Sequence, residues 1–192
     1  AQNIDTEDVS TIAEALLEDR VSVAILSTPA VNFLYHYTRI CKKRIDPTFF
    51  LTVGDEPLNE IDSRDARDAK MYMYTHAIIG ASRFYAVRPI REDVSVYEEM
   101  LRRVESLIIE HFDSVRLDIK CEFLVCAKIL EYPTPLFERI EAEILHSKSL
   151  SGTYIVDVEN EHSSKTREAS FSRSEHRNVL AIMAFSSIPE AL

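Results

Sequence analysis

The stretch MYMYTHAIIGASRFYAVRP, residues 71–89, is the part of the chain on which the predicted fold depends. In its first six residues, Tyr72, Tyr74 and His76 alternate with methionine or threonine. A period of two residues is typical of a strand, whose side chains point to opposite faces in turn. Gly80 interrupts the alternation, so the stretch predicts one bent strand or a β-hairpin.

Helices are expected on both sides of this stretch. Residues 95–112, SVYEEMLRRVESLIIEHF, carry an apolar face at helical spacing, and Ser95 followed by Glu98 matches a capping box. Residues 29–44 favour a helix that ends in Lys42–Arg44, where the helix dipole favours positive charge, but their run FLYHYTRI keeps a strand as an alternative. Two further segments with a helical apolar face are 5–18 and 135–148.

Strands are expected where β-branched or wholly apolar runs occur. These segments are 21–27, 48–53, 83–88, 115–130 (one strand, or two that turn near Lys120), 153–159 and 178–186. The predicted fold class is therefore α+β: a mixed, mainly antiparallel β-sheet with amphipathic helices packed on one face and with extended loop or hairpin arms. We expect a single domain over residues 1–192, with an arm at 161–178 and with residues 55–70 forming an exposed loop or a short exposed helix.

Composition narrows the classes of function. The formal net charge of −10 disfavours a nucleic-acid binder, because neutralising phosphates requires a basic surface. With only three glycines, the chain has no glycine-rich phosphate loop. Three cysteines without a secretory leader suggest a reducing compartment, with Cys121 and Cys126 in the core. No apolar run approaches the roughly 20 residues that span a bilayer, so we expect no membrane contact.

No cofactor, no metal site and no catalytic residue is predicted. Two histidines, His162 and His176, each follow a glutamate and suggest a metal site only weakly. The acidic residues between Glu60 and Asp68 alternate with arginines, which is typical of a solvated surface whose charges pair with one another. The chain is therefore predicted not to be an enzyme. An enzyme that uses His76 or these acidic residues is kept as an alternative hypothesis.

The arm contains the sequence SSKTREASFSRSEHRN, residues 163–178, and this stretch carries a net charge of +2 on an acidic chain. A basic arm is suited to bridging between copies, and such head-to-tail contacts close into rings. An ordinary flexible loop is the alternative. The predicted partner-binding residues are Lys165, Arg167, Phe171, Arg173 and Arg177.

The order of the expected elements over about residues 5–127 resembles that of the tail terminator or tail completion (neck) proteins of tailed bacteriophages. The resemblance rests on the helix IDTEDVSTIAEALLED (4–19), the β-rich segment MYMYTHAIIGASRFYAV (71–87) and the long helix 95–112. It implies a non-enzymatic subunit of a hexameric ring whose partners are copies of itself and neighbouring assembly proteins. It also implies that the protein is found in the virion after assembly in the host cytoplasm; otherwise a cytoplasmic location is expected.

A second hypothesis is a ferredoxin-like binding or regulatory module. The expected elements from the strand 83–88 to the strand 153–159 follow the order βαββαβ. Such a module could contact nucleic acid through the basic loop, although the fold serves many functions and does not determine one.

Overall fold

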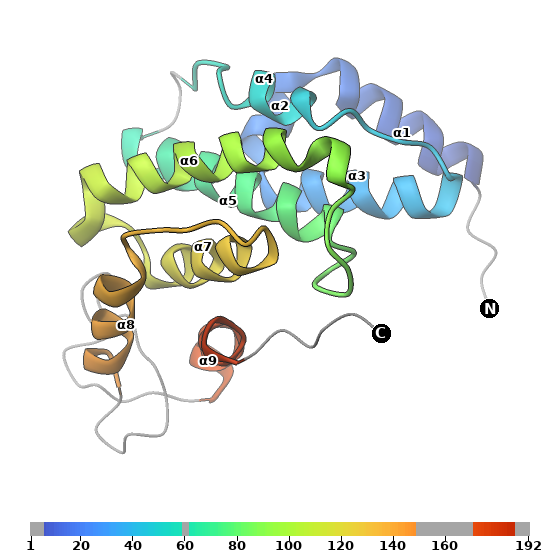
Figure 1. Ribbon diagram of the computed structural model, residues 1–192. Helices are drawn as coiled ribbons and strands as arrows, with labels where there is room; N and C mark the ends of the chain where they lie inside the picture. The colour runs from blue at the N-terminus through green and yellow to red at the C-terminus, as the bar shows by residue number, and fades with distance from the viewer. Residues whose placement is uncertain (1–5, 59–61, 149–170, 187–192) are drawn as a thin grey trace. The chain divides into compact units, whose positions relative to one another are not determined.

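All regular elements of the computed structural model are helical in the part that it describes, residues 6–58, 62–148 and 171–186 (Figure 1). The prediction of an α+β fold with a mixed, mainly antiparallel sheet is therefore wrong, since these residues contain no strand. The strand 153–159 lies outside the described residues. Without the strands at 83–88 and 115–130, the ferredoxin-like order is wrong as well.

The chain divides into two compact units, Ala1–Met100 and Leu101–Leu192. The helices that begin in the first unit are α1 (Thr6–Glu18), α2 (Arg20–Leu26), α3 (Thr28–Cys41), α4 (Thr48–Val53), α5 (Ser63–Ala81), the 3₁₀-helix η1 (Arg91–Asp93) and α6 (Val94–His111), which continues into the second unit. The second unit adds η2 (Phe112–Ser114), α7 (Leu117–Ile129), α8 (Phe137–His146) and α9 (Phe171–Phe185). Helices α1, α3, α6 and α8 confirm the four predicted helices.

The stretch 71–89 shows why strands were wrongly expected, since its first half lies in α5. This helix begins at Ser63, inside the segment predicted as an exposed loop or a short exposed helix, and the Asp62 carboxylate caps it by accepting a hydrogen bond from the Arg64 amide (2.8 Å). Nearly all of its second half is buried, including Met71, Met73 and Tyr74. A helix that is buried on all sides shows no 3.6-residue pattern, and its methionine–tyrosine alternation does not mark two different faces.

The same physical reason applies to α7, in which nearly every residue is buried. Cys121 and Cys126 are among them, and both thiols are free, which confirms the prediction of core cysteines. The buried ammonium of Lys120 donates to both carboxylate oxygens of Glu143 on α8 (2.8 and 2.6 Å). Helices α2, α4 and α9 also replace predicted strands, at 21–27, 48–53 and 178–186.

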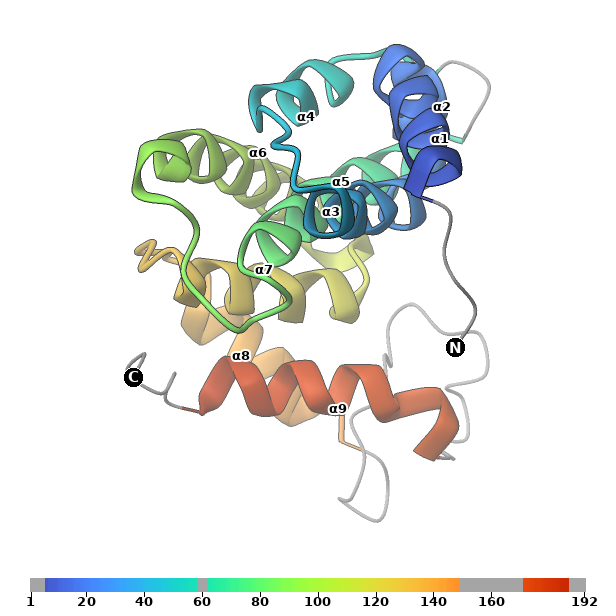
Figure 2. The same ribbon diagram turned by 90° about the vertical axis from the view of Figure 1, so that its right-hand side faces the viewer.

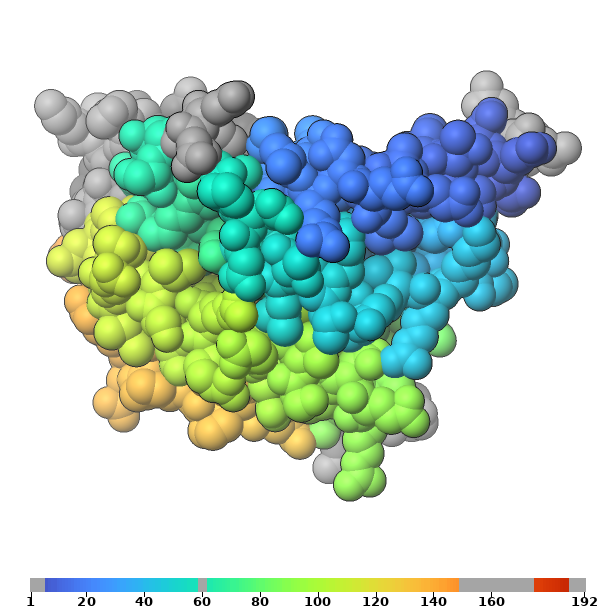
Figure 3. Space-filling view, turned by 90° about the horizontal axis from the view of Figure 1, so that it is seen from above, coloured from blue at the N-terminus to red at the C-terminus, as the bar shows by residue number. Residues whose placement is uncertain are grey.

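In the first unit, α3 packs along α5, and α1 packs on α3 (Figure 1). The Tyr35 ring of α3 stacks on Phe50 of α4, with ring centroids 5.8 Å apart. Gly80 of α5 permits this arrangement, because a Cβ atom at Gly80 would lie 2.2 Å from Cδ2 of Tyr35. Seen from above, the surface of α2 (blue) adjoins that of α4 (cyan) (Figure 3).

In the second unit, α9 packs against α7 (Figure 2). Near the start of α9, the Arg177 guanidinium donates to Oδ2 of Asp118 on α7 (2.9 Å). At its end, Nζ of Lys128 donates to the carbonyl oxygens of Met183 (2.7 Å) and Ala184 (3.3 Å). These carbonyls belong to the last turn, where a helix has no backbone donors of its own, so α7 supplies a cap for α9.

Candidate functional site

The predicted partner-binding residues of the arm are placed in part. Lys165 and Arg167 lie outside the described residues, and Phe171 and Arg173 belong to the first turn of α9. Arg177 is only 5% exposed and contacts Asp118 of the same chain. Its observed role is to hold α9 on α7, and contact of these residues with a partner stays a prediction.

The weaker candidates do not form a common site in the described part of the chain. Nδ1 of His76 lies 3.0 Å from Oδ1 of Asn32, and Asp62 caps α5. The His176 ring lies 3.7 Å from Asp118 and 3.8 Å from Glu122. Among the described residues, no group of three or more histidine, cysteine, aspartate or glutamate side chains has the geometry to hold a metal ion. His162 and Glu60 lie outside those residues.

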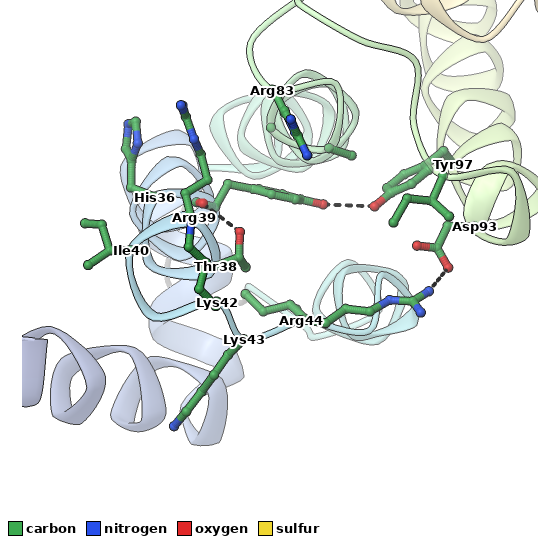
Figure 4. Close-up of a pocket in the computed structure, with 15 residues that line it drawn as sticks. His36, Thr38, Arg39, Ile40, Lys42, Lys43, Arg44, Arg83, Asp93 and Tyr97 are labelled. Atoms are coloured by element: carbon green, nitrogen blue, oxygen red, sulfur yellow. Dashed lines mark hydrogen bonds and ion pairs between the residues drawn. The ribbon is translucent and has the colours of Figure 1, made fainter.

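A pocket of about 870 Å³ opens in the first unit (Figure 4). It is formed by the C-terminal ends of α3 and α5, the segments that follow them, η1 and the start of α6. Its volume falls within the range of roughly 300–1,000 Å³ that is typical of small-molecule sites. No pattern in the sequence predicted this pocket.

The lining of the pocket is strongly cationic. Five lysine or arginine residues face one carboxylate, that of Asp93. The cationic residues are Arg39, Lys42, Lys43, Arg44 and Arg83. This local excess of positive charge stands out because the whole chain carries a formal charge of −10. Low-dielectric walls lined by one sign of charge raise the local concentration of ligands of the opposite sign.

Two of these cations are already paired. Nζ of Lys43 donates to Oε1 of Glu14 (2.9 Å), and this contact raises the pKa of Lys43. The Arg44 guanidinium donates to Oδ1 of Asp93 (2.5 Å). Within the described residues, no carboxylate forms an ion pair with Arg39, Lys42 or Arg83, and all three side chains are exposed. The pocket therefore retains three cations that can contact an anion.

Arg83 reaches the pocket from an unusual turn, which also shows that the predicted strand 83–88 is wrong. Arg83, Phe84 and Tyr85 have φ values of 54°, 56° and 72°, in the left-handed region that costs a non-glycine residue about 1–2 kcal/mol. Oγ of Ser82 stabilises the turn by accepting from the Tyr85 amide (2.9 Å) and donating to the Ile79 carbonyl (2.7 Å).

The same turn orders a neighbouring side chain at the pocket. The ring of Phe84 stacks on that of His36, with centroids 4.9 Å apart and an angle of 18° between the planes. Left-handed backbone conformations of non-glycine residues persist where the surrounding structure determines them, and they cluster at binding sites. The left-handed turn is therefore a second feature, independent of charge, that distinguishes this region.

Two tyrosine hydroxyls supply the neutral polar groups of the pocket. The hydroxyls of Tyr35 and Tyr97 are 3.1 Å apart (dashed line in Figure 4). Burial raises the pKa of Tyr97 to about 12 and that of Tyr35 well above its usual value, and the charge of Asp93 acts in the same direction. Both hydroxyls stay protonated at neutral pH. Because one proton serves their mutual hydrogen bond, the other remains for a further acceptor.

Tyr35 offers the pocket its hydroxyl rather than a ring face. Phe50 stacks on the ring, and the Gly80 backbone lies directly against it. These two contacts occupy much of the surface of the ring, which leaves little of it for stacking with a flat aromatic ligand. Charge and hydrogen bonds, rather than aromatic stacking, are what these residues provide.

No protein-family model matches this chain, nor does any curated protein or solved structure. The segment 71–87, on which the resemblance to phage neck proteins depends, lies mainly in α5 instead of a β-rich region, and the resemblance itself is neither supported nor refuted by these comparisons. None of the described helices combines the length and the apolar character needed to cross a membrane.

Proposed function

We propose that this chain is a ligand-binding protein whose first unit takes a small anion in the pocket between α3, α5 and η1. The observation that carries the proposal is the convergence of Arg39, Lys42 and Arg83, none of them in an ion pair among the described residues, on one pocket of an acidic protein. Arginine provides planar, two-pronged donors that fit carboxylate and phosphate groups, and lysine adds a point charge.

Basic residues at these positions also have a structural role, which the test must separate from binding. Arg39 and Lys42 lie at the C-terminal end of α3, where positive charge stabilises a helix by about 0.3–1 kcal/mol. If Arg39 and Lys42 only stabilise the helix, replacing them should lower the stability of the protein without changing its affinity for anions.

The direct test is calorimetric titration with tripolyphosphate and with citrate at constant ionic strength. Replacing Arg39, Lys42 and Arg83 together with methionine should weaken binding by roughly 3- to 150-fold, since each contact of an anion with an exposed cation is worth about 0.2–1 kcal/mol. Affinity should also fall as salt is added, because exposed charges are screened.

A matched control removes three positive charges elsewhere. Arg20, Arg116 and Lys148 do not line the pocket, and their joint replacement with methionine changes the net charge by the same amount. This control should keep nearly all of the affinity. Equal losses in both triple variants would show a nonspecific charge effect and would overturn the proposal.

A second candidate function is the assembly role expected from the sequence, a non-enzymatic subunit of a homo-oligomeric ring. It is supported by three apolar side chains on α9 that are largely exposed: Val179 (48%), Ile182 (67%) and Phe185 (42%). Their spacing of three residues places them on one side of the helix. A place in a bacteriophage neck or tail, and in the virion, belongs to this second proposal and rests on the sequence resemblance alone.

A further inference from the structure

The ion pair of Arg44 and Asp93 lies in the lining of the pocket. Figure 4 shows the Arg44 side chain extended toward Asp93, with the Tyr97 hydroxyl close by. The Asp93 side chain is only 14% exposed, whereas that of Arg44 is 56% exposed. The Asp93 carboxylate thus offers the cations of the pocket a negatively charged oxygen acceptor, as an anionic ligand would.

We propose that Arg44 is a fourth anion-binding cation, that Asp93 competes with the ligand for it, and that the ligand consequently carries several negative charges. This inference rests on the proposed function, because it concerns the same pocket. It adds the charge class of the ligand and identifies the residue that limits its affinity.

Charge balance supports a multiply charged ligand. Arg39, Lys42 and Arg83 leave three positive charges without an ion pair among the described residues, and a ligand with one negative charge would leave two of them uncompensated. A ligand with three or more negative charges balances them. Any further oxyanion group competes with Asp93 for Arg44, whose exposed side chain can turn from the carboxylate to the ligand.

The exchange costs little because of where the pair lies. Ion pairs with an exposed member contribute little to stability, and a ligand group that replaces the carboxylate recovers most of that contribution. Asp93 also holds Arg44 away from the ligand for as long as the ion pair stays formed. Removing this one carboxylate should therefore strengthen binding, which is the opposite of what loss of a binding residue does.

The test compares Asp93→Asn with Glu92→Gln in titrations with tripolyphosphate. Glu92 belongs to the same 3₁₀-helix, is exposed and does not line the pocket, so its replacement changes the net charge equally. Asp93→Asn should bind about fivefold more tightly than the wild type, whereas Glu92→Gln should change affinity by less than about twofold. Wild-type protein should bind tripolyphosphate more tightly than orthophosphate.

Arg44→Met completes a double-mutant cycle. In that background Asp93→Asn should no longer strengthen binding beyond the change seen for Glu92→Gln, because the cation for which the two anions compete is gone. If Asp93→Asn does not fold, Arg44→Met alone remains informative: it should weaken tripolyphosphate binding more than Arg20→Met does. Citrate in place of tripolyphosphate tells whether carboxylate or phosphate groups are preferred, and tight binding of either supports the inference.

The outcomes separate the two proposals. If the wild type binds tripolyphosphate and the pocket triple variant does not, while Asp93→Asn gains no more than Glu92→Gln, the pocket binds anions but Asp93 is not a competitor. A gain that persists without Arg44, or equal affinity for orthophosphate and tripolyphosphate, also overturns the inference. If neither the wild type nor Asp93→Asn binds any of the three anions, the proposed function itself is wrong.

Discussion

Gly80 is the residue on which the contact of α3 with α5 depends most directly. Its hydrogen atom stands where a Cβ atom would lie 2.2 Å from Cδ2 of Tyr35, and the stacked ring of Phe50 limits the movement of the Tyr35 ring. Alanine is about 1 kcal/mol better than glycine inside a helix, but an extra methyl group in a packed core costs about 1–3 kcal/mol. We expect Gly80→Ala to lower the free energy of unfolding by up to about 2 kcal/mol, measured by urea denaturation.

The control for this prediction removes the ring rather than the glycine. In a Tyr35→Leu background the clash is relieved, so the same Gly80→Ala change should become neutral or stabilising. Additive losses in the double variant would mean that Gly80 acts through something other than contact with Tyr35.

At the scale of elements, α9 is held on α7 by charged side chains whose pKa values are shifted in opposite directions. Contact with Asp118 raises the pKa of His176 against the opposing effect of burial, and the Glu122 carboxylate also raises it. The pKa of Asp118 is lowered, because the contacts with His176 and Arg177 outweigh the effect of burial. Asp118 therefore stays charged from pH 5.5 upward, and His176 is the member of this cluster that changes charge near neutral pH.

The sign of the pH dependence follows from the raised pKa. Protonated His176 stabilises the folded state fully below its unfolded pKa of 6.5, and this stabilisation is lost as the pH rises through the higher folded pKa. The side chain is 63% exposed, so solvent screening limits the effect to a few tenths of a kcal/mol. The wild type should exceed His176→Asn in stability at pH 5.5, and the difference should shrink by pH 8.5 in denaturant titrations. A difference that grows with pH would contradict this assignment.

At the scale of the whole molecule, the assembly role makes a prediction about oligomeric state. If α9 is an interface between copies, light scattering after size exclusion should show an oligomer at micromolar concentration, and Ile182→Lys should dissociate it, because a lysine would be buried there without a partner. Ile109 on α6 is also largely exposed (52%) and belongs to a different helix, so Ile109→Lys is the control that should leave the oligomer intact. A wild-type monomer at that concentration would count against assembly through α9.

The predictions from sequence succeeded where a helix has one apolar face and one polar face. Helix α6 is the clearest case, with buried Tyr97, Leu101, Val104 and Ile108 at helical spacing. They failed for the second half of α5 and for α7, where nearly every residue is buried, so that no period in the sequence separates a buried helix from a buried strand. Helices α2 and α4 are too short, at seven and six residues, to show a period.

The candidate pocket could be predicted only in part. The run Lys42–Arg44 was visible and was interpreted as the basic end of a helix, which the structure bears out for Lys42 at the end of α3. Arg83, about forty positions away, gave no sign of belonging to the same site. It reaches the pocket through a left-handed turn of three non-glycine residues, which local sequence preferences do not predict.

The sequence by itself determined the acidic charge of the protein, its amphipathic helices and the burial of its core cysteines, because these depend on composition and on local spacing. Only the tertiary structure decided that the buried apolar segments are helices and that Arg39, Lys42, Arg44 and Arg83 share one pocket. The reason is the same in both cases: packing between distant segments selects the conformation of a uniformly apolar stretch, and it alone brings together charges that the chain keeps far apart.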